Sequence, residues 1–125
     1  MAANDPEPSP VVLIVEDEPL VRVVVVEYLR ERGVRVVEAE NAIMALALLN
    51  VRSDIRLVFT DINMPGLDGL ALAREVRRRS PSMRTMLTSG RQISPAEIPV
   101  EAEFFPKPYD FEKVADRIQT ALRGR

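Results

Sequence analysis

Residues 11–19, Val-Val-Leu-Ile-Val-Glu-Asp-Glu-Pro, contain the segment that decides the fold. The first five side chains are apolar and four of them are β-branched, which is typical of a strand buried on both faces of a parallel sheet. Glu16 and Asp17 follow at once, and Pro19 can occupy the first turn of a helix, with Asp17 as its cap. The segment therefore predicts a buried strand, an acidic turn and a helix in direct succession.

The same alternation of strand and helix recurs along the rest of the chain. Apolar runs predict further strands at residues 34–39, 55–60, 84–88 and 104–105, and helices at 41–51, 68–80 and from 110 onward. Residues 92–100 contain two prolines, so a fourth helix there must be short or irregular. Strands that alternate with helices indicate right-handed crossovers and a doubly wound parallel sheet covered on both faces. We therefore predict an α/β fold with five strands and about five helices.

Apolar spacing also predicts which helix faces are buried. In the first helix, over about residues 19–32, the predicted inward side chains are Val21, Val24, Val25 and Tyr28. In the helix over 41–51, the side chains that recur at helical spacing are Ile43, Leu46, Ala47 and Asn50. These two sets are expectations from periodicity alone.

Composition excludes several kinds of chemistry. The 125 residues suffice for one domain, and 17 Lys and Arg against 19 Asp and Glu give a net charge of −2, which argues against non-specific nucleic-acid binding. The chain has no cysteine and no histidine, so disulfides, a Cys/His zinc site, a Ser-His-Asp triad and imidazole acid–base catalysis are excluded. Carboxylates, hydroxyls, amines and a hard metal ion are left as possible reactive groups.

The first ten residues differ from the rest in composition. They contain three prolines and two acids without apolar periodicity, which predicts a disordered tail over 1–10 and a folded domain over 11–125. The start lacks a secretion signal, and no apolar run approaches the roughly 18 residues that a membrane span needs. We therefore expect a cytoplasmic domain that binds neither membrane nor nucleic acid, as a monomer or weak dimer.

Reactive side chains lie where four of the five predicted strands end. Glu16 and Asp17 follow the first strand, Asp61 the third, Thr88 ends the fourth and Lys107 follows the fifth. Open parallel sheets place their functional groups beyond the carboxyl ends of the strands, so these side chains should meet at one edge. The sequence thus predicts three carboxylates, a hydroxyl and an ammonium in one small region.

This combination of groups suits phosphoryl chemistry. Two carboxylates about 4 Å apart repel by roughly 4 kcal/mol at an effective dielectric constant near 20, so the cluster favours a bound cation such as Mg²⁺. Lys107 can pair with Asp61 and with a phosphoryl oxygen, and Thr88 can donate to the same oxygens. Asp61 is the best candidate for a nucleophile that forms an aspartyl phosphate, because it lies between the acidic pair and the lysine in the expected sheet.

Together with the turns that follow these residues, the pattern resembles the receiver domain of bacterial two-component response regulators, of the stand-alone single-domain type. The further motifs are Asn63-Met64-Pro65-Gly66, Asp68-Gly69, Thr88-Ser89-Gly90 and Lys107-Pro108-Tyr109. Each motif alone is weak, but their order and spacing over about residues 11–122 are highly specific. The resemblance implies a flavodoxin-like sheet with strand order 2-1-3-4-5.

The resemblance also implies roles for particular residues. Asp61 would accept a phosphoryl group from a phosphohistidine on a histidine kinase or a histidine phosphotransfer protein, which agrees with the lack of histidine in this chain. Asp17 and Asp61 would bind Mg²⁺ through their side chains, Asn63 through its backbone carbonyl, and Glu16 through water. The downstream protein target is not implied.

Other implied roles concern the response to phosphorylation. Thr88 and Lys107 would hold phosphoryl oxygens, Thr88 and Phe104 would form the switch pair, and the Lys107–Pro108 peptide would be cis. Phe104 also fits a plain core aromatic, and it lacks the hydroxyl of the tyrosine often found there. The acidic pair is Glu-Asp instead of Asp-Asp, and the fourth helix is expected to be truncated.

The sequence also leaves two other functions open. One is a phosphatase of the aspartyl-phosphate type, although such enzymes generally have a second Asp where Asn63 stands, and they carry a cap for which this chain has no spare length. The other is a binding module that acts without phosphorylation. We expect a phosphoacceptor that assists its own phosphorylation and dephosphorylation and is not an enzyme, and, because the chain ends soon after the last helix, one without an output domain.

Overall fold

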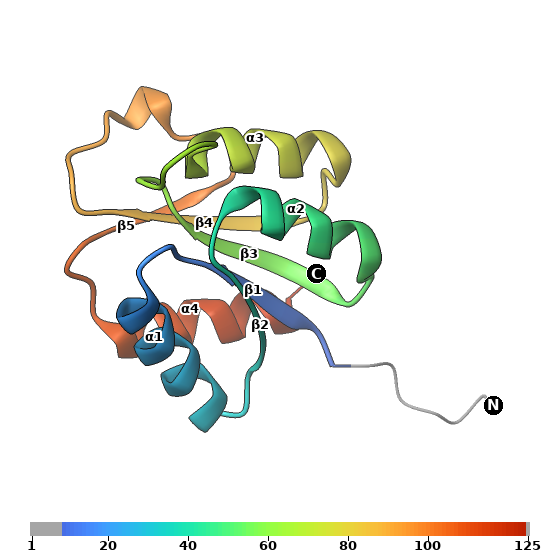
Figure 1. Cartoon of the computed structure of the whole chain (residues 1–125). Helices are drawn as coiled ribbons and strands as arrows, with labels where there is room; N and C mark the ends of the chain where they lie inside the picture. The colour runs from blue at the N-terminus through green and yellow to red at the C-terminus, as the bar shows by residue number, and fades with distance from the viewer. Residues whose placement is uncertain (1–8, 125) are drawn as a thin grey trace.

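The structure, a computed structural model, describes residues 9–124, which form five strands and four α-helices (Figure 1). The elements in chain order are β1 (Val11–Val15), α1 (Pro19–Glu31), β2 (Arg35–Ala39), α2 (Ala42–Val51), β3 (Ile55–Asp61), α3 (Gly69–Arg79), β4 (Arg84–Ser89), the 3₁₀ turn η1 (Pro95–Glu97), β5 (Glu103–Pro106) and α4 (Phe111–Arg123). The predicted disordered tail over 1–10 lies almost entirely outside the described residues. Among residues 9–124, no helix is long and apolar enough to span a membrane.

All five strands belong to one parallel sheet with the order β2-β1-β3-β4-β5, which confirms the predicted doubly wound topology. This order places β1 and β4 on either side of β3. In the register, Val15 is paired with Thr60, and Asp61 is paired with Thr88. The carboxyl ends of the three central strands therefore lie next to one another.

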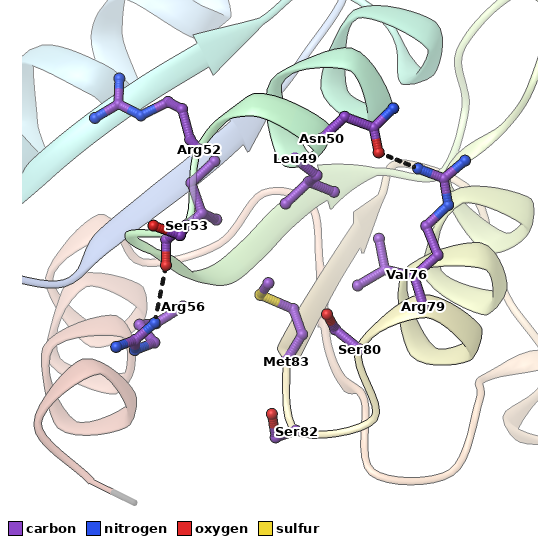
Figure 2. Close-up of a pocket in the computed structure, with 11 residues that line it drawn as sticks. Leu49, Asn50, Arg52, Ser53, Arg56, Val76, Arg79, Ser80, Ser82 and Met83 are labelled. Atoms are coloured by element: carbon purple, nitrogen blue, oxygen red, sulfur yellow. Dashed lines mark hydrogen bonds between the residues drawn. The ribbon is translucent and has the colours of Figure 1, made fainter.

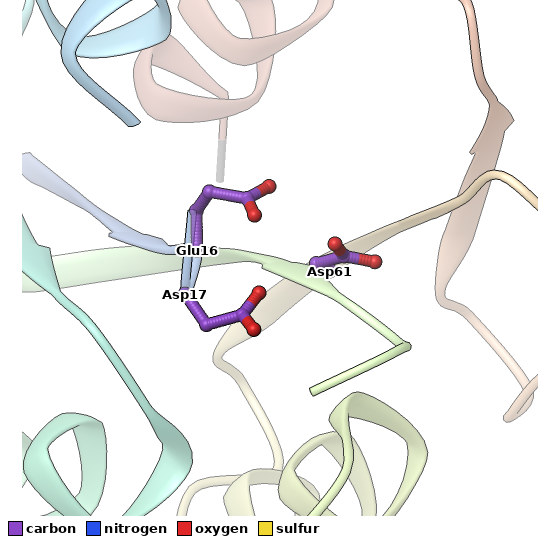
Figure 3. A group of neighbouring side chains, drawn as sticks. All are labelled: Glu16, Asp17 and Asp61. Atoms are coloured by element: carbon purple, nitrogen blue, oxygen red, sulfur yellow. The ribbon is translucent and has the colours of Figure 1, made fainter. Parts of the chain in front are cut away.

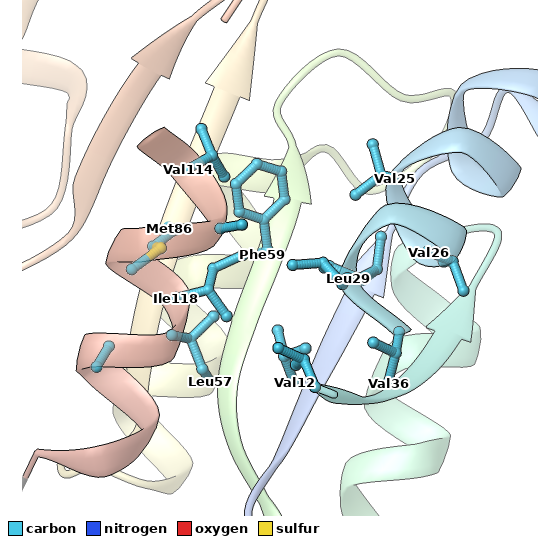
Figure 4. Packing of buried hydrophobic residues seen from close by; sticks show 14 residues of the cluster. Val12, Val25, Val26, Leu29, Val36, Leu57, Phe59, Met86, Val114 and Ile118 are labelled. Atoms are coloured by element: carbon cyan, nitrogen blue, oxygen red, sulfur yellow. The ribbon is translucent and has the colours of Figure 1, made fainter. Parts of the chain in front are cut away.

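Two apolar layers cover the sheet. On one face, α1 and α4 pack against side chains of β1, β3 and β4, among them Val12, Phe59 and Met86 (Figure 4). Helices α2 and α3 cover the other face (Figure 1), where their buried side chains belong to the same cluster as Leu13 and Val58. Every side chain of β1 is at most 1% exposed, as its continuous apolar sequence predicts.

Side chains cap three of the four α-helices, at the residues where the sequence predicts these helices to start. The side chains of Asn41, Asp68 and Asp110 accept hydrogen bonds from the first turns of α2, α3 and α4. The expectation that Asp17 caps the first helix is wrong, because Glu18 occupies the cap position of α1 and makes no side-chain cap bond. Asp17 precedes the cap position by one residue, and its carboxylate lies instead beside Glu16 and Asp61 at the carboxyl edge of the sheet.

The structure has four α-helices where the sequence predicts about five. Between β4 and β5 the chain forms only the single 3₁₀ turn η1, which agrees with the expected short or irregular fourth helix. Pro95 begins this turn, and Pro99 lies two residues after its end. Because proline has no backbone N–H, neither residue can donate a helical hydrogen bond. Ile93 and Ile98 still pack against the cluster that contains Ile62 and Leu87.

The predicted inward faces of α1 and α2 are partly wrong. In α1 the buried side chains are Val25, Val26 and Leu29, whereas Val24 is 49% exposed. In α2 the buried side chains are Ala42 and Ala45, whereas Ile43 is 68% exposed. Both helices are apolar over more than one face, so periodicity alone does not select the side that contacts the sheet.

Candidate functional site

The three predicted carboxylates meet at the carboxyl edge of the sheet. Glu16 and Asp17 follow β1, and Asp61 ends the neighbouring strand β3. One carboxylate oxygen from each of the three residues lies within 4.8 Å of the others, and this is the one such group of acidic side chains among residues 9–124. Figure 3 shows the side chains of Glu16 and Asp17 extending from the end of β1 on the side where Asp61 lies.

Lys107, the first residue after β5, joins this cluster. Its Nζ donates to Asp61 Oδ2 at 3.1 Å and lies 3.5 Å from Glu16 Oε1. The backbone N–H of Lys107 donates to the carbonyl of Ser89 at 2.9 Å, which fixes the start of the loop, and the Lys107–Pro108 peptide is cis as expected. The structure thus brings together residues that are 91 positions apart in the chain.

Burial of Glu16 has an electrostatic consequence. The residue is 5% exposed, and this loss of hydration raises the pKa of its carboxyl above the ordinary value. The N–H of Glu18, which donates to Glu16 Oε2 at 3.1 Å, acts in the opposite direction, and the charge of Asp61 raises the pKa further. The cluster therefore holds its negative charge at an energetic cost that a nearby cation would relieve.

The cationic and phenolic groups beside the cluster also respond to it. Burial lowers the pKa of Lys107, but the hydrogen bond from its ammonium to Asp61 and the charges of Asp61 and Glu16 outweigh burial, so the pKa is raised. Burial raises the pKa of Tyr109, and the negative charges of Glu16 and Asp61 raise it further. Lys107 thus remains a cation and Tyr109 a neutral phenol near neutral pH.

Asp61 is held by its own loop as well as by Lys107. Its Oδ1 accepts a hydrogen bond of 3.1 Å from the backbone N–H of Asn63, and the residue is 5% exposed. Behind it, Gly69 begins α3 and donates its N–H to the carbonyl of Ile62 at 2.9 Å. A Cβ at Gly69 would lie 2.3 Å from the carbonyl oxygen of Asp61, so only glycine permits this close approach.

Thr88 has an unsatisfied hydroxyl. The residue is 1% exposed and lies opposite Asp61 in the register of β3 and β4. Its Oγ1 is buried and has no hydrogen-bond partner within the described part of the chain. Such groups are rare because each costs desolvation energy, roughly 1–3 kcal/mol, and the absence of a partner is consistent with a hydroxyl that donates to a ligand.

Asn63 lies in the loop after β3, and Phe104 lies in β5, as the sequence predicts. Asn63 is held by a hydrogen bond, whereas Phe104 is held by apolar packing. The side-chain carbonyl of Asn63 accepts a hydrogen bond from the Ser89 hydroxyl, which links the loop after β3 to the end of β4. Phe104 is half-buried and packs against the cluster that includes Ile62 and Leu87. Its structural environment is that of an aromatic at the margin of the core.

The donor set of this edge fits a hard divalent cation. Three carboxylates against one ammonium leave a local charge of −2, and the available ligands are oxygen atoms. Mg²⁺ prefers oxygen ligands and binds to few protein carboxylates, with water or phosphate in its remaining positions. Glu16, Asp17 and Asp61 are the described residues whose side chains could hold it.

A cavity of about 350 Å³ lies at the opposite edge of the sheet, below the ends of α2 and α3 (Figure 2). Three arginines line it, but each guanidinium group is bound to a neighbour. Arg79 donates to Asn50, and Arg56 donates to the carbonyl of Ser53. Arg52 makes two hydrogen bonds with Asp54. These groups do not converge on a common point, so we do not assign the cavity a function.

Three further residues organise the site: the sequence motifs include Ser89 and Gly69 without giving them a role, and they do not include Arg22. Arg22 Nη1 donates to the carbonyl of Glu16 at 2.6 Å while its Nε donates to Glu38 Oε1 at 3.1 Å. Ser89 binds Asn63, and Gly69 provides the close approach to Asp61. The motifs Thr88-Ser89-Gly90 and Asp68-Gly69 placed Ser89 and Gly69 beside the site, but no local pattern indicates that Arg22 contacts the acidic turn.

Comparison with known proteins agrees with this geometry. Residues 12–119 match the family model of the response regulator receiver domain. The chain is 33% identical over 125 residues to the sensor kinase CckA of Brucella abortus, covering 96% of this chain and 13% of that protein. The receiver domain of NtrX from Brucella abortus superposes with a TM-score of 0.81 at 32% identity, covering 91% of this chain and 99% of that one.

A third structure is that of the response regulator TrrA from Thermotoga maritima in complex with Mg²⁺ and BeF, with a TM-score of 0.77 at 27% identity. The alignment covers 90% of this chain and 98% of that chain. Against four full-length relatives, in contrast, this chain spans 13%, 35%, 31% and 50% of their lengths. The similarity therefore concerns one domain that occurs within larger proteins.

Proposed function

The chain belongs to the response regulator receiver family of two-component systems, and from this membership we propose that it accepts a phosphoryl group on Asp61 in a Mg²⁺-dependent reaction. The donor would be a phosphohistidine of a histidine kinase or histidine phosphotransfer protein. The observation that carries the proposal is the geometry around Asp61, where Lys107 Nζ lies at 3.1 Å and the buried Thr88 hydroxyl lacks a partner.

The reaction is an in-line transfer at phosphorus. A carboxylate oxygen of Asp61 attacks, the bond from phosphorus to the donor imidazole nitrogen breaks, and an acyl phosphate forms. Loss of the phosphoryl group reverses the roles, as water attacks phosphorus and the Asp61 carboxylate leaves. In this proposal the domain assists its own phosphorylation and dephosphorylation but does not act on other substrates as an enzyme.

The chain's own residues position the group. Lys107, already paired with Asp61, can move its ammonium to a phosphoryl oxygen, and Thr88 can donate its free hydroxyl to another oxygen. Glu16, Asp17, Asp61 and the backbone carbonyl of Asn63 would hold Mg²⁺. When bound, this ion supplies positive charge that offsets the repulsion between the incoming phosphoryl oxygens and the acidic cluster.

Phosphorylation would act on partners through the two strand ends that hold the site. Thr88 is paired in register with Phe105, and Leu87 with Phe104, so movement of the Thr88 hydroxyl toward a phosphoryl group would affect the packing of β5. We propose that Thr88 and Phe104 transmit this change to a protein-binding surface. A domain that is phosphorylated by such donors would act in the cytoplasm. We also propose that it acts as a stand-alone unit.

A small-molecule phosphodonor tests the acceptor residue directly. Incubation with acetyl phosphate and Mg²⁺ should add one phosphoryl group, detected by intact-protein mass spectrometry, and Asp61→Asn should abolish the addition. Asp68→Asn is the matched control, because this acid lies in the same loop, caps α3, and asparagine caps helices equally well. Labelling of Asp61→Asn at the wild-type level would contradict the proposal, and steady turnover of phosphate monoesters would favour the phosphatase.

A further inference from the structure

The exposed side of α2 differs from the exposed sides of the other helices in having no charge. The ten residues of α2 are Ala, Ile, Met, Ala, Leu, Ala, Leu, Leu, Asn and Val. Its outward side chains include Ile43 at 68% exposure, Met44 at 45% and Val51 at 78%, with Ala47 exposed between them. Surface helices normally present polar side chains to water, and a helix that is apolar all round is typically buried. This face is therefore expected to be covered.

Other helices of the same chain provide the contrast. The exposed positions of α3 include Arg74, Arg77 and Arg78, and those of α4 include Asp116 and Arg117. Helix α1 also exposes Leu20 and Val23, but Glu27 and Glu31 lie on its outer side as well. Moreover, α1 begins two residues after Asp17, so a molecule bound at its start would lie beside the acidic site. Among the described helices, α2 is the one whose outer face is apolar without charged neighbours in the helix.

We propose that the outer face of α2 is an interface between two copies of this chain, with the two α2 helices antiparallel about a two-fold axis at Ala47. Ile43, Ala47 and Val51 are spaced four residues apart, so they form one row along the helix. A two-fold axis at Ala47 places Ile43 of one copy against Val51 of the other, twice. Such a surface is complementary to itself, as an isologous interface requires.

The small central residue permits the contact. An alanine side chain at the crossing point lets two helix backbones approach closely, while the larger Ile43 and Val51 fill the space on either side. Met44 lies one turn before Ala47 on the same exposed side and can adapt its unbranched side chain to the remaining gap. The row large–small–large is thus matched by its own antiparallel copy.

Charges at the two ends of α2 favour the same orientation. Glu40 precedes the helix, is exposed and makes no ion pair within the described part of the chain. The other end has more positive than negative charge, because Arg52 shares Asp54 with Arg35, and Arg79 shares Glu75 with Arg78. Antiparallel pairing brings the acidic end of each helix toward the basic end of the other and also opposes the helix dipoles. A parallel pair would instead place like charges together.

The size of the face predicts a weak dimer. The helix is about 15 Å long and contributes four exposed apolar side chains, which is less than the area of roughly 800 Å² per partner of a standard interface. We therefore expect a dissociation constant between about 10 µM and 1 mM. The interface leaves the carboxyl edge of the sheet open, so it is independent of the proposed phosphorylation.

Sedimentation velocity of the unphosphorylated full chain over a range of concentrations tests the interface. The wild type should shift from monomer toward dimer with increasing concentration, and Ile43→Glu and Val51→Lys should each weaken the dimer by at least about tenfold, because each buries an unpaired charge. The double variant should recover dimerisation, since the two new charges of opposite sign face each other across the axis. Arg74→Glu, on α3, is the control for a change of surface charge and should have a smaller effect.

The lack of cysteine allows a second, independent test of the axis. Ala47→Cys introduces a single thiol at the crossing point, where oxidation should link two copies much faster than it does for Ala96→Cys, a matched exposed alanine in η1. Equal rates for the two variants would overturn the proposed axis. A chain that stays monomeric to about 1 mM, or a dimer that Ile43→Glu does not weaken, would overturn the interface itself.

Discussion

Replacement of Gly69 by alanine tests the connection between the fold and the candidate site. Gly69 is the first residue of α3, and its backbone contacts the end of β3. An added Cβ would lie 2.3 Å from the carbonyl oxygen of Asp61, 2.7 Å from Cα of Ile62 and 2.9 Å from the carbonyl carbon of Asp61. Since heavy atoms in contact prefer about 3.5–4.0 Å, either α3 or the end of β3 must move by about 1 Å.

The expected cost follows from these contacts. Overpacking of a rigid core typically costs about 1–3 kcal/mol, and here all three neighbouring atoms belong to the backbone, which cannot rotate away. The movement would also weaken the 2.9 Å hydrogen bond from the Gly69 N–H to Ile62. Without the clash, a change from glycine to alanine in a helix would stabilise the protein by about 0.4–1 kcal/mol. We expect Gly69→Ala to lower the free energy of unfolding by about 2–3 kcal/mol.

Urea denaturation followed by circular dichroism measures this difference. With a slope of about 1–3 kcal/mol per molar urea, the midpoint should fall by about 0.7–3 M. Gly90→Ala is the matched control, because a Cβ there meets no atom within 4 Å, and its unfolding free energy should change by less than about 0.5 kcal/mol. Gly69→Ala should also accept a phosphoryl group from acetyl phosphate more slowly than the wild type, because the clash moves Asp61. A Gly69→Ala variant as stable as the wild type would refute the reasoning.

Three further perturbations have distinct expected results. Mg²⁺ at about ten times its dissociation constant should stabilise the wild type by about 1.4 kcal/mol in urea denaturation, and Asp17→Asn should remove most of this effect; equal stabilisation of both proteins would contradict the proposed ligand. Arg22→Ala should lower the unfolding free energy by about 1.5–3 kcal/mol, because a side chain only 16% exposed loses charge-assisted hydrogen bonds to the acidic turn and to Glu38, and Arg22→Lys should restore part of it. Hydrogen bonds from two arginines lower the pKa of Glu75 to about 2, so its contribution to stability is present above its ordinary pKa near 4.5 and is lost as the pH falls toward 2. Glu75→Gln should therefore have a shallower loss of stability over this acidic range than the wild type, and identical pH profiles would exclude the contribution.

Local sequence patterns predicted much of the fold because each pattern has a local physical cause. The apolar run of β1 can only be buried on both faces, and it is. Helices were predicted to start at Asn41, Asp68 and Asp110, and in the structure these side chains satisfy free N–H groups at the helix starts. The prolines between β4 and β5 remove helical hydrogen bonds, which predicted the irregular segment but not that only a 3₁₀ turn would form.

The faces of α1 and α2 were predicted less well for an equally physical reason. Both helices have apolar residues on several sides, so the choice of buried face depends on contacts with the sheet and not on periodicity. Val24 and Ile43 fit an inward face by spacing but are largely exposed. The same ambiguity concealed the apolar outer face of α2, which became visible only when the buried side was known.

The sequence by itself determined the alternation of strands and helices, and it placed Glu16, Asp17, Asp61, Thr88 and Lys107 at or just after strand ends, because hydrophobic runs and turn residues act over a few neighbouring positions. Only the tertiary structure decided that one carboxylate oxygen from each acid lies within 4.8 Å of the others, that Lys107 approaches Asp61 to 3.1 Å, and that the Thr88 hydroxyl is left without a partner. Those contacts join strands that are distant in sequence, and their distances depend on strand order, register and close packing throughout the domain.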